Sequence, residues 1–268
     1  MTRPMAFPIK FWAVLLICLL TYQFSTNVSA DDCKYEKDID LALDLSGTDT
    51  LAIAAGAGSL KVTGVSGSDE AVIQGKACAS KEEWLDQSDI STTTGKRAEI
   101  AVKLPQDNGS WFSWGNNYAR IDLVIEVPEN LSLDLSDSSG GMYLTNVAST
   151  KLKDSSGEIE IEDARGSITI NDSSGDIEIK GVAGDLTIES DSSGGIYGED
   201  IDGAVLVERD SSGDIRFTNV GKDVIVERDS SGSITVVDVG GDFRVLKDGS
   251  GNIRSSNVKG DTELPDDH

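Results

Sequence analysis

The carboxylates best placed to do chemistry recur at one place in a repeated tetrapeptide. Asp-Ser-Ser-Gly returns along the second half of the chain, ending in an Asp-Gly-Ser-Gly variant, with successive spacings of 17, 18 and then 19 residues. The aspartates that open these copies are Asp137, Asp154, Asp172, Asp191, Asp210, Asp229 and Asp248. If the copies stack, these aspartates form a row of oxygen ligands of the kind that calcium prefers.

An ordinary turn explains the same aspartates. Calcium takes six to eight oxygen ligands, and the glycine-rich repeat known to bind it has a nine-residue period. An aspartate that opens a turn can accept a hydrogen bond from its own following backbone, and the glycine supplies a positive φ. Neighbouring carboxylates would then repel by only about 1 kcal/mol in water-like surroundings. We expect turn residues, with calcium binding as the alternative, and no cofactor.

Catalysis by the carboxylates is the next hypothesis to weigh. Enzymes built on β-helices use paired acids to cleave polysaccharides, but they build a cleft from protruding loops, whereas the units here are short and regular. The single histidine, His268, is the last residue, so a histidine base, a catalytic triad or a histidine-ligated zinc has no candidate. We expect no enzyme, and a glycan-active enzyme is the least favoured alternative.

An aromatic group marks a segment that departs from the repeat. Trp111, Phe112, Trp114 and Tyr118 lie close together in the sequence. They could pack as a lid over the core or, if exposed, form a binding hot spot or a platform on which sugars stack. We favour the lid and retain these residues as the candidate binding loop.

The first thirty residues have the layout of a secretory signal. Arg3 and Lys10 carry positive charge, residues 11–20 are apolar, and small residues end the segment at Ala30. That apolar run is too short to span a bilayer. We expect cleavage before Asp31, no membrane span afterwards, and export to the periplasm or cell surface.

Two cysteines follow that segment, Cys33 and Cys78. An even number of cysteines in an exported protein indicates a disulfide, because the export route is oxidising.

The charge of the chain restricts its partners. With 47 acidic and 23 basic side chains, the formal net charge is −24. Binding nucleic acid needs a clustered basic surface, and anionic membranes would repel this chain. Nucleic acid is therefore excluded, and the expected partner is an envelope component, a surface glycan or protein, or a second copy of the chain.

Each unit predicts two short strands joined by two corners. With the aspartate as position 1, apolar residues recur at positions 6, 8, 11, 15 and 17; in one unit these are Ile177, Ile179, Val182, Leu186 and Ile188. Such alternation is typical of half-buried strands. Five buried side chains at about 2 kcal/mol each do not offset the roughly 20 to 40 kcal/mol needed to order one unit. The units must stack, so we expect an all-β, single-domain β-solenoid (β-helix).

A less regular region precedes the repeat. Alternating segments at 51–67, 71–77, 98–104 and 121–127 are expected to be strands. Ser80 and Glu83 have capping-box spacing, which predicts a short helix over 81–87. Residues 105–118 predict an aromatic hairpin loop.

The expected organisation therefore has three parts. Residues 1–30 are the signal peptide, 31–136 are N-terminal solenoid turns interrupted by the helix and hairpin, and 137–265 are regular repeats.

These motifs resemble the bacterial family named "putative adhesin", an uncharacterised group of exported repeat proteins. The resemblance rests on Gly58-Ser59-Leu60-Lys61-Val62-Thr63-Gly64-Val65, on Leu123-Val124-Ile125-Glu126-Val127-Pro128 and on Asp-Ser-Ser-Gly-x-Ile-x-Ile. It covers roughly residues 45–265, and it implies a β-solenoid with a role in surface attachment, without catalytic or ligand residues to carry over. We therefore expect a non-catalytic envelope binding module, with a self-associating structural element as the alternative.

Overall fold

Strands dominate the structure, a computed structural model that describes residues 33–105 and 117–266. They form two sheets of 11 strands each, sheet A and sheet B. Within the described ranges, no helix is long and apolar enough to cross a membrane. The expected all-β solenoid is confirmed.

The strands of each sheet follow one another in space in an order that differs from their order in the sequence. Sheet A consists of β1 (Tyr35–Asp44), β4 (Glu70–Ala79), β7 (Ala119–Pro128), β3 (Leu60–Val65), β9 (Met142–Thr145), β11 (Ile159–Ala164), β13 (Ile177–Val182), β15 (Ile196–Ile201), β17 (Ile215–Val220), β19 (Ile234–Val239) and β21 (Ile253–Val258). Sheet B consists of β22 (Thr262–Glu263), β20 (Phe243–Val245), β18 (Val224–Val226), β16 (Val205–Val207), β14 (Leu186–Ser190), β12 (Ile168–Asn171), β10 (Thr150–Lys153), β8 (Ser132–Ser139), β2 (Thr50–Ala57), β6 (Arg97–Lys103) and β5 (Asp89–Thr93).

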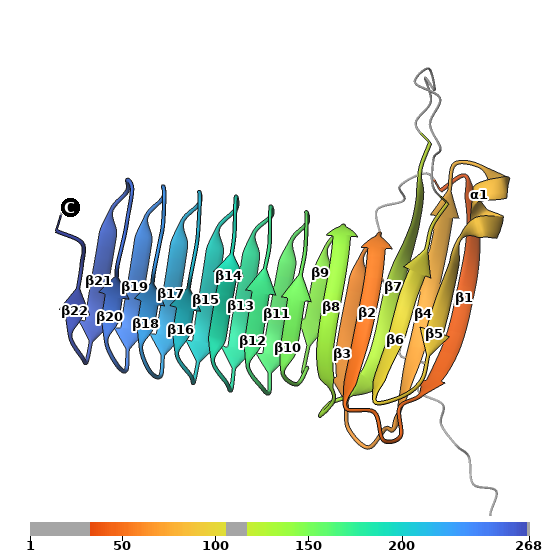
Figure 1. Cartoon of the computed structure of the whole chain (residues 1–268), viewed down its shortest axis with the longest axis horizontal. Helices are drawn as coiled ribbons and strands as arrows, with labels where there is room; N and C mark the ends of the chain where they lie inside the picture. Colours follow the sequence, from red (N-terminus) through yellow and green to blue (C-terminus); the bar gives the residue numbers. More distant parts are fainter. Residues whose placement is uncertain (1–32, 106–116, 267–268) are drawn as a thin grey trace, which may run out of the picture. The chain divides into compact units, whose positions relative to one another are not determined.

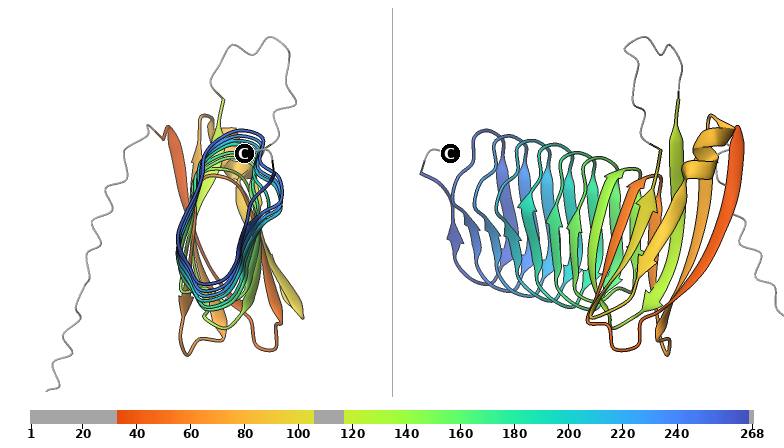
Figure 2. Two further views of the ribbon diagram at one scale, coloured as in Figure 1. Left: turned by 90° about the vertical axis from the view of Figure 1, so that its left-hand side faces the viewer. Right: turned by 45° about the vertical axis from the view of Figure 1, so that its right-hand side comes forward.

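From β8 onward the chain alternates between the two sheets, so one strand of each makes a rung (Figure 1). Seen end-on, successive rungs superpose as one flattened loop (Figure 2). The strands are parallel and in register: Ile177 lies opposite Ile196, and Ile196 lies opposite Ile215. All three side chains are fully buried. Equivalent apolar residues therefore stack into continuous columns, which supplies the burial that one unit lacks.

Close stacking is what requires glycine at position 4. These glycines all have positive φ, between 124° and 150° from Gly140 to Gly251. A Cβ added to Gly213 would lie 1.6 Å from the carbonyl oxygen of Gly194 on the preceding rung. Any side chain here would push the rungs apart, so the expected role of this glycine is confirmed and extended.

The bend at position 10, near the end of each strand of sheet A, was not predicted. The residues at position 10 all adopt positive φ: Asn146, Asp163, Gly181, Asp200, Asn219, Asp238 and Asn257. Glycine, asparagine and aspartate are the residues that tolerate this conformation best. Their side chains also bond between rungs, because Asn219 donates from Nδ2 to Oδ1 of Asp200 at 2.6 Å.

The N-terminal region corrects the expected hairpin. Strands β6 and β7 lie in different sheets, so they do not pair as a hairpin. The β2–β3 rung lies between β6–β7 and β8–β9, since β2 pairs with β6 and β8, and β3 pairs with β7 and β9. Strands β1, β4 and β5 add antiparallel edges.

The short helix is present, but its predicted cap is wrong. Helix α1 (Glu82–Gln87) follows Lys81, and no side chain caps its first turn. The backbone N–H of Ser80 instead donates to the carbonyl oxygen of Tyr118 at 2.9 Å. This bond continues the antiparallel pairing of β4 with β7 by one more residue, so Ser80 belongs to the sheet.

Candidate functional site

The aspartates at position 1 point into the solenoid. Asp154, Asp172, Asp191, Asp210 and Asp229 are 0–1% exposed, and Asp137 is 6% exposed. We call these six residues the interior aspartate column. Asp248 continues it at the last repeat and is half-buried. The expectation of carboxylates in water-like surroundings is therefore wrong.

Only part of the column makes the expected turn bonds. These run from the N–H groups of Ser155, Ser193 and Ser231 to Asp154, Asp191 and Asp229, at 2.7, 3.2 and 3.1 Å respectively. Within the described ranges, the carboxyl oxygens of Asp137, Asp172 and Asp210 make no hydrogen bond of good distance and angle. The N–H groups of the two serines that follow each of them are still near enough to lower its pKa. The turn interpretation therefore accounts well for three of the six aspartates and only weakly for the other three.

Burial changes the protonation of this column. It raises the pKa of Asp210 to about 7, and the carboxyl groups of Asp229 and Asp191 on the adjoining rungs add to the rise. Burial likewise raises the pKa of Asp137, Asp172 and Asp229 to about 6. Part of the column is therefore protonated near neutral pH, because adjacent carboxylates cannot all be ionised away from water.

The described aspartates do not form a cluster of calcium ligands. Across residues 33–105 and 117–266, no group of three or more His, Cys, Asp or Glu side chains is placed to hold a metal ion. Metal binding by the aspartates stays a prediction.

The outer face of sheet A carries a different column, made by position 7. In-register pairing places Tyr143, Glu160, Glu178, Tyr197 and Arg216 next to one another on successive rungs. We call these five residues the outer column. Unlike the interior positions, they mix aromatic, acidic and basic side chains.

A hollow of about 420 Å³ lies over β11 to β17 on this face. Its side-chain lining includes Glu160, Glu162, Glu178, Lys180, Tyr197, Glu199, Arg216 and Thr218. Partial burial raises the pKa of Glu160, and the neighbouring carboxylates of Glu162, Glu158 and Glu178 raise it further. The hollow therefore combines crowded carboxylates with two cations and one aromatic ring, and we take it as the candidate binding site.

Sequence reasoning missed this site, although a signal was present. Two units have glycine at position 5, as Gly141 and Gly195, and these are also the two units with tyrosine at position 7. The other units carry a larger residue at position 5 and a charged residue or threonine at position 7. This paired substitution would have identified the two tyrosine rungs.

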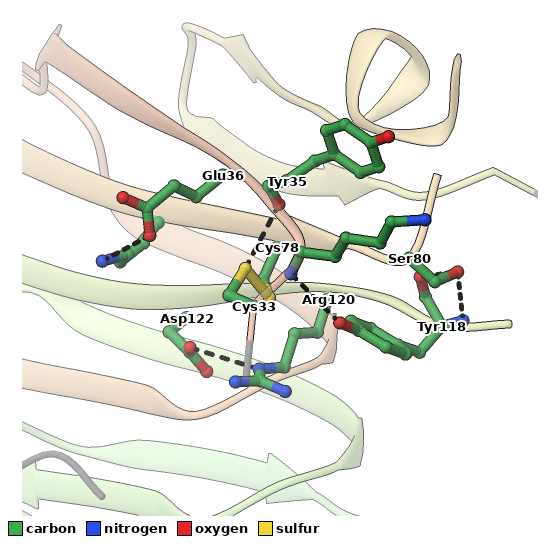
Figure 3. Close-up of a disulfide and its surroundings, with 10 residues drawn as sticks. Cys33, Tyr35, Glu36, Cys78, Ser80, Tyr118, Arg120 and Asp122 are labelled. Carbon is green, nitrogen blue, oxygen red and sulfur yellow. Dashed lines mark hydrogen bonds and ion pairs between the residues drawn. A yellow bond between two sulfur atoms is a disulfide. The ribbon is translucent and has the colours of Figure 1, made fainter. Parts of the chain in front are cut away.

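The expected disulfide is confirmed. Cys33 and Cys78 are joined, and the bond ties the residue just before β1 to the end of β4 (Figure 3). Nearby, Tyr118 accepts a hydrogen bond at its hydroxyl from the N–H of Lys34 at 3.3 Å. Tyr118 therefore helps to hold this corner of the antiparallel region.

The rest of the candidate aromatic loop cannot be placed in this way. Trp111, Phe112 and Trp114 lie outside the described residues, so the lid and the binding hot spot both remain predictions.

Comparison with known families identifies one domain. Residues 28–171 match the N-terminal domain of toast_rack, DUF2154, which runs from before β1 to the end of β12. No curated protein matches the chain at a significant level.

Among solved structures, the chain is similar to several proteins at low identity and low TM-score. A protein described as a putative adhesin from Parabacteroides merdae is 14% identical, with 87% of this chain and 97% of that chain covered and a TM-score of 0.37. A putative adhesin from Bacteroides fragilis is 11% identical, with 85% and 97% covered and a TM-score of 0.37. A putative cell adhesion protein from Clostridium sporogenes is 13% identical, with 86% and 99% covered and a TM-score of 0.31. Scores this low do not establish a shared function.

Proposed function

The chain belongs to the family defined by the N-terminal domain of toast_rack, DUF2154, and from that premise we propose that it is an exported, non-catalytic binding module of the cell envelope. The contact surface is the outer face of sheet A. The observation that carries this proposal is the hollow over β11 to β17, which combines acidic, basic and aromatic side chains.

Rigid support favours this face as a binding surface. Each outer side chain in the hollow alternates with an inward residue of the core: Glu178 lies between Ile177 and Ile179, both of which are buried. Parallel pairing on both sides then fixes the strand in its sheet. A ligand would meet a preformed surface, which lowers the entropic cost of binding.

Export is supported by the disulfide and by the first thirty residues. Disulfides such as Cys33–Cys78 persist mainly in oxidising compartments. The basic, apolar and small-residue pattern before Asp31 fits a cleavable signal.

The geometry of the glutamates favours binding over catalysis. Glycoside hydrolases place two carboxyl groups on either side of the bond that they cleave. Glu160 and Glu178 instead occupy equivalent positions on adjacent strands and project from the same sheet face. Both can contact one side of a ligand, but they do not bracket a bond.

The test is co-sedimentation of the purified mature protein with envelope fragments. Tyr197→Ala on sheet A should reduce the bound fraction several-fold, whereas the control Leu206→Ala, on the outer face of sheet B in the same repeat, should leave it unchanged. Equal binding by both variants and the unchanged protein would reject sheet A as the contact surface. Release of soluble sugars from the fragments would reject the non-catalytic assignment, and sedimentation without fragments would indicate self-association.

A further inference from the structure

The two tyrosines of the outer column lie flat against sheet A. A Cβ added to Gly195 would lie 2.2 Å from the hydroxyl oxygen of Tyr197 and 2.3 Å from its Cζ. At Gly141, the corresponding distance to the hydroxyl oxygen of Tyr143 is 2.6 Å. Each ring therefore leans along its strand and covers the glycine two residues before it. The hydroxyl end of the ring lies against this glycine, and both tyrosines stay partly exposed.

Register fixes the spacing of these rings. Three rung steps separate Tyr143 from Tyr197, with Glu160 and Glu178 on the two rungs between them. At about 4.8 Å per step the rings are roughly 14 Å apart along the solenoid axis. This surface suits an extended ligand that lies across several strands.

The polar groups around the rings suit a ligand with hydroxyl groups. Glu160 and Glu178 can accept hydrogen bonds, whereas Lys180 and Arg216 can only donate them. A polyhydroxylated chain satisfies both kinds of group, because each hydroxyl both donates and accepts. Its apolar ring faces can cover the tyrosines. An anion would be repelled by the four glutamates of the hollow, and a simple cation would be repelled by Lys180 and Arg216.

Building on the proposed function, we propose that the outer column and the hollow form a stacking site for a neutral glycan chain that runs along the solenoid axis. Tyr197 and the hollow hold one end of the bound segment, and Tyr143 holds the other. Glu160 and Glu178 bond to the hydroxyls between them.

Binding of cellohexaose and chitohexaose, followed by calorimetry, tests this directly. Tyr197→Ala should lower the affinity for at least one of them by about tenfold, the upper range for one aromatic contact. Leu206→Ala, on sheet B, should not change it. Tyr143→Ala should weaken the hexasaccharide but not the disaccharide of the same series, because the disaccharide is too short to reach both rings.

Gly195→Ala separates ring placement from folding. The three atoms nearest to the new methyl group all belong to the Tyr197 side chain, so we expect the ring to move while the rung stays intact. The affinity should fall about as far as in Tyr197→Ala, and the double variant should fall no further. Additive losses would overturn the flat-ring assignment.

The remaining outcomes distinguish this inference from the proposed function. If envelope fragments bind through Tyr197 but neither hexasaccharide binds at millimolar concentration, the glycan assignment fails and the binding module stands. If the hexasaccharides bind but Tyr197→Ala does not affect binding to envelope fragments, the proposed function fails. A pentalysine probe tests the cationic alternative: stronger binding than either glycan, lost between 50 and 500 mM salt, would overturn the proposal.

Discussion

The residues at position 1 and those at position 7 both stack in register from rung to rung, but position 1 points into the solenoid and position 7 points outward. Inside, position 1 repeats one residue, so the interior aspartate column brings identical carboxyl groups together away from water. Outside, position 7 changes from Tyr143 to Glu160 to Arg216 along the same register. The interior is constrained by its neighbours above and below, whereas the outer face can vary in chemistry without affecting the stack. Recognition therefore belongs on the outer face.

Insertion of one residue after Ile215 should have the largest effect, because it exchanges the inner and outer sides. Beyond the insertion, inward residues such as Phe217 would face solvent. We expect a loss of more than about 5 kcal/mol of unfolding free energy from the exposed side chains. Deletion of the whole repeat 210–228 keeps the register and should leave a cooperative melt. Chemical denaturation of both variants checks this, and a harmless insertion with a disruptive deletion would contradict it.

Two glycine-to-alanine substitutions compare the stability cost at a corner of the rung with the cost on the outer face of sheet A. Gly213→Ala places a methyl group against the backbone of Gly194 at a positive φ of 137°. It should cost about 3 kcal/mol or more through strain and clash. The nearest atoms to the methyl group of Gly195→Ala belong to the movable Tyr197 ring, so this change should cost less than about 1 kcal/mol. Equal losses in urea denaturation would show that the rung spacing is not set by the corner glycines.

The interior carboxyl groups should make the protein less stable as pH rises. The pKa of Asp210 is raised by burial from 3.8 to about 7, so the folded state holds a proton that the unfolded chain releases. This contribution is fully present below about pH 4 and is lost as the pH rises through about 7. Asp210→Asn should therefore stabilise the protein at pH 8 by on the order of 2 kcal/mol, and much less at pH 4.

Thermal melts at both pH values check this prediction. Glu178→Gln, on the outer face, is the matched control and should change the melting temperature little. If Asp210→Asn destabilised the protein at pH 8, the ionised carboxylate would have a stabilising partner, and the protonated column would be wrong.

Calcium should have the smallest effect. Replacing excess calcium with a chelator should change the melting temperature by less than about 3 °C. A ligand at a hundredfold excess over its Kd would add about 2.7 kcal/mol and move the melt by more than about 5 °C. A shift of that size would show that calcium binds the folded protein and would contradict the turn interpretation of the aspartates.

The sequence predicted the core but not the direction of the aspartates. Alternation identified Ile177 and Ile179 directly, because inward residues repeat every second position. Strict alternation does place Asp137, Asp154 and Asp172 inside, because each follows an inward residue by two positions. From Ile188 to Asp191 the offset is odd, so strict alternation would place Asp191 outside. A shift of register between β12 and β14 turns it inward. Such an irregularity depends on pairing between rungs, which the spacing of one unit does not encode.

Contacts between segments that are distant in the sequence explain why the order of the N-terminal rungs and the placement of the tyrosines were not predicted. The β2–β3 rung lies between two rungs that come later in the chain, and no local pattern marks this order. The flat tyrosines were readable in principle from Gly141 and Gly195, but their meaning depends on the ring lying over the glycine.

Tyrosine footprinting of the mature protein bound to envelope fragments tests the binding face most directly. Chemical modification followed by mass spectrometry would compare Tyr143 and Tyr197, on the outer face of sheet A, with Tyr35 in the antiparallel region as the internal control. We predict that binding protects Tyr143 and Tyr197 from modification several-fold and leaves Tyr35 unchanged. Unchanged modification of Tyr143 and Tyr197 in the bound protein would contradict recognition by this face.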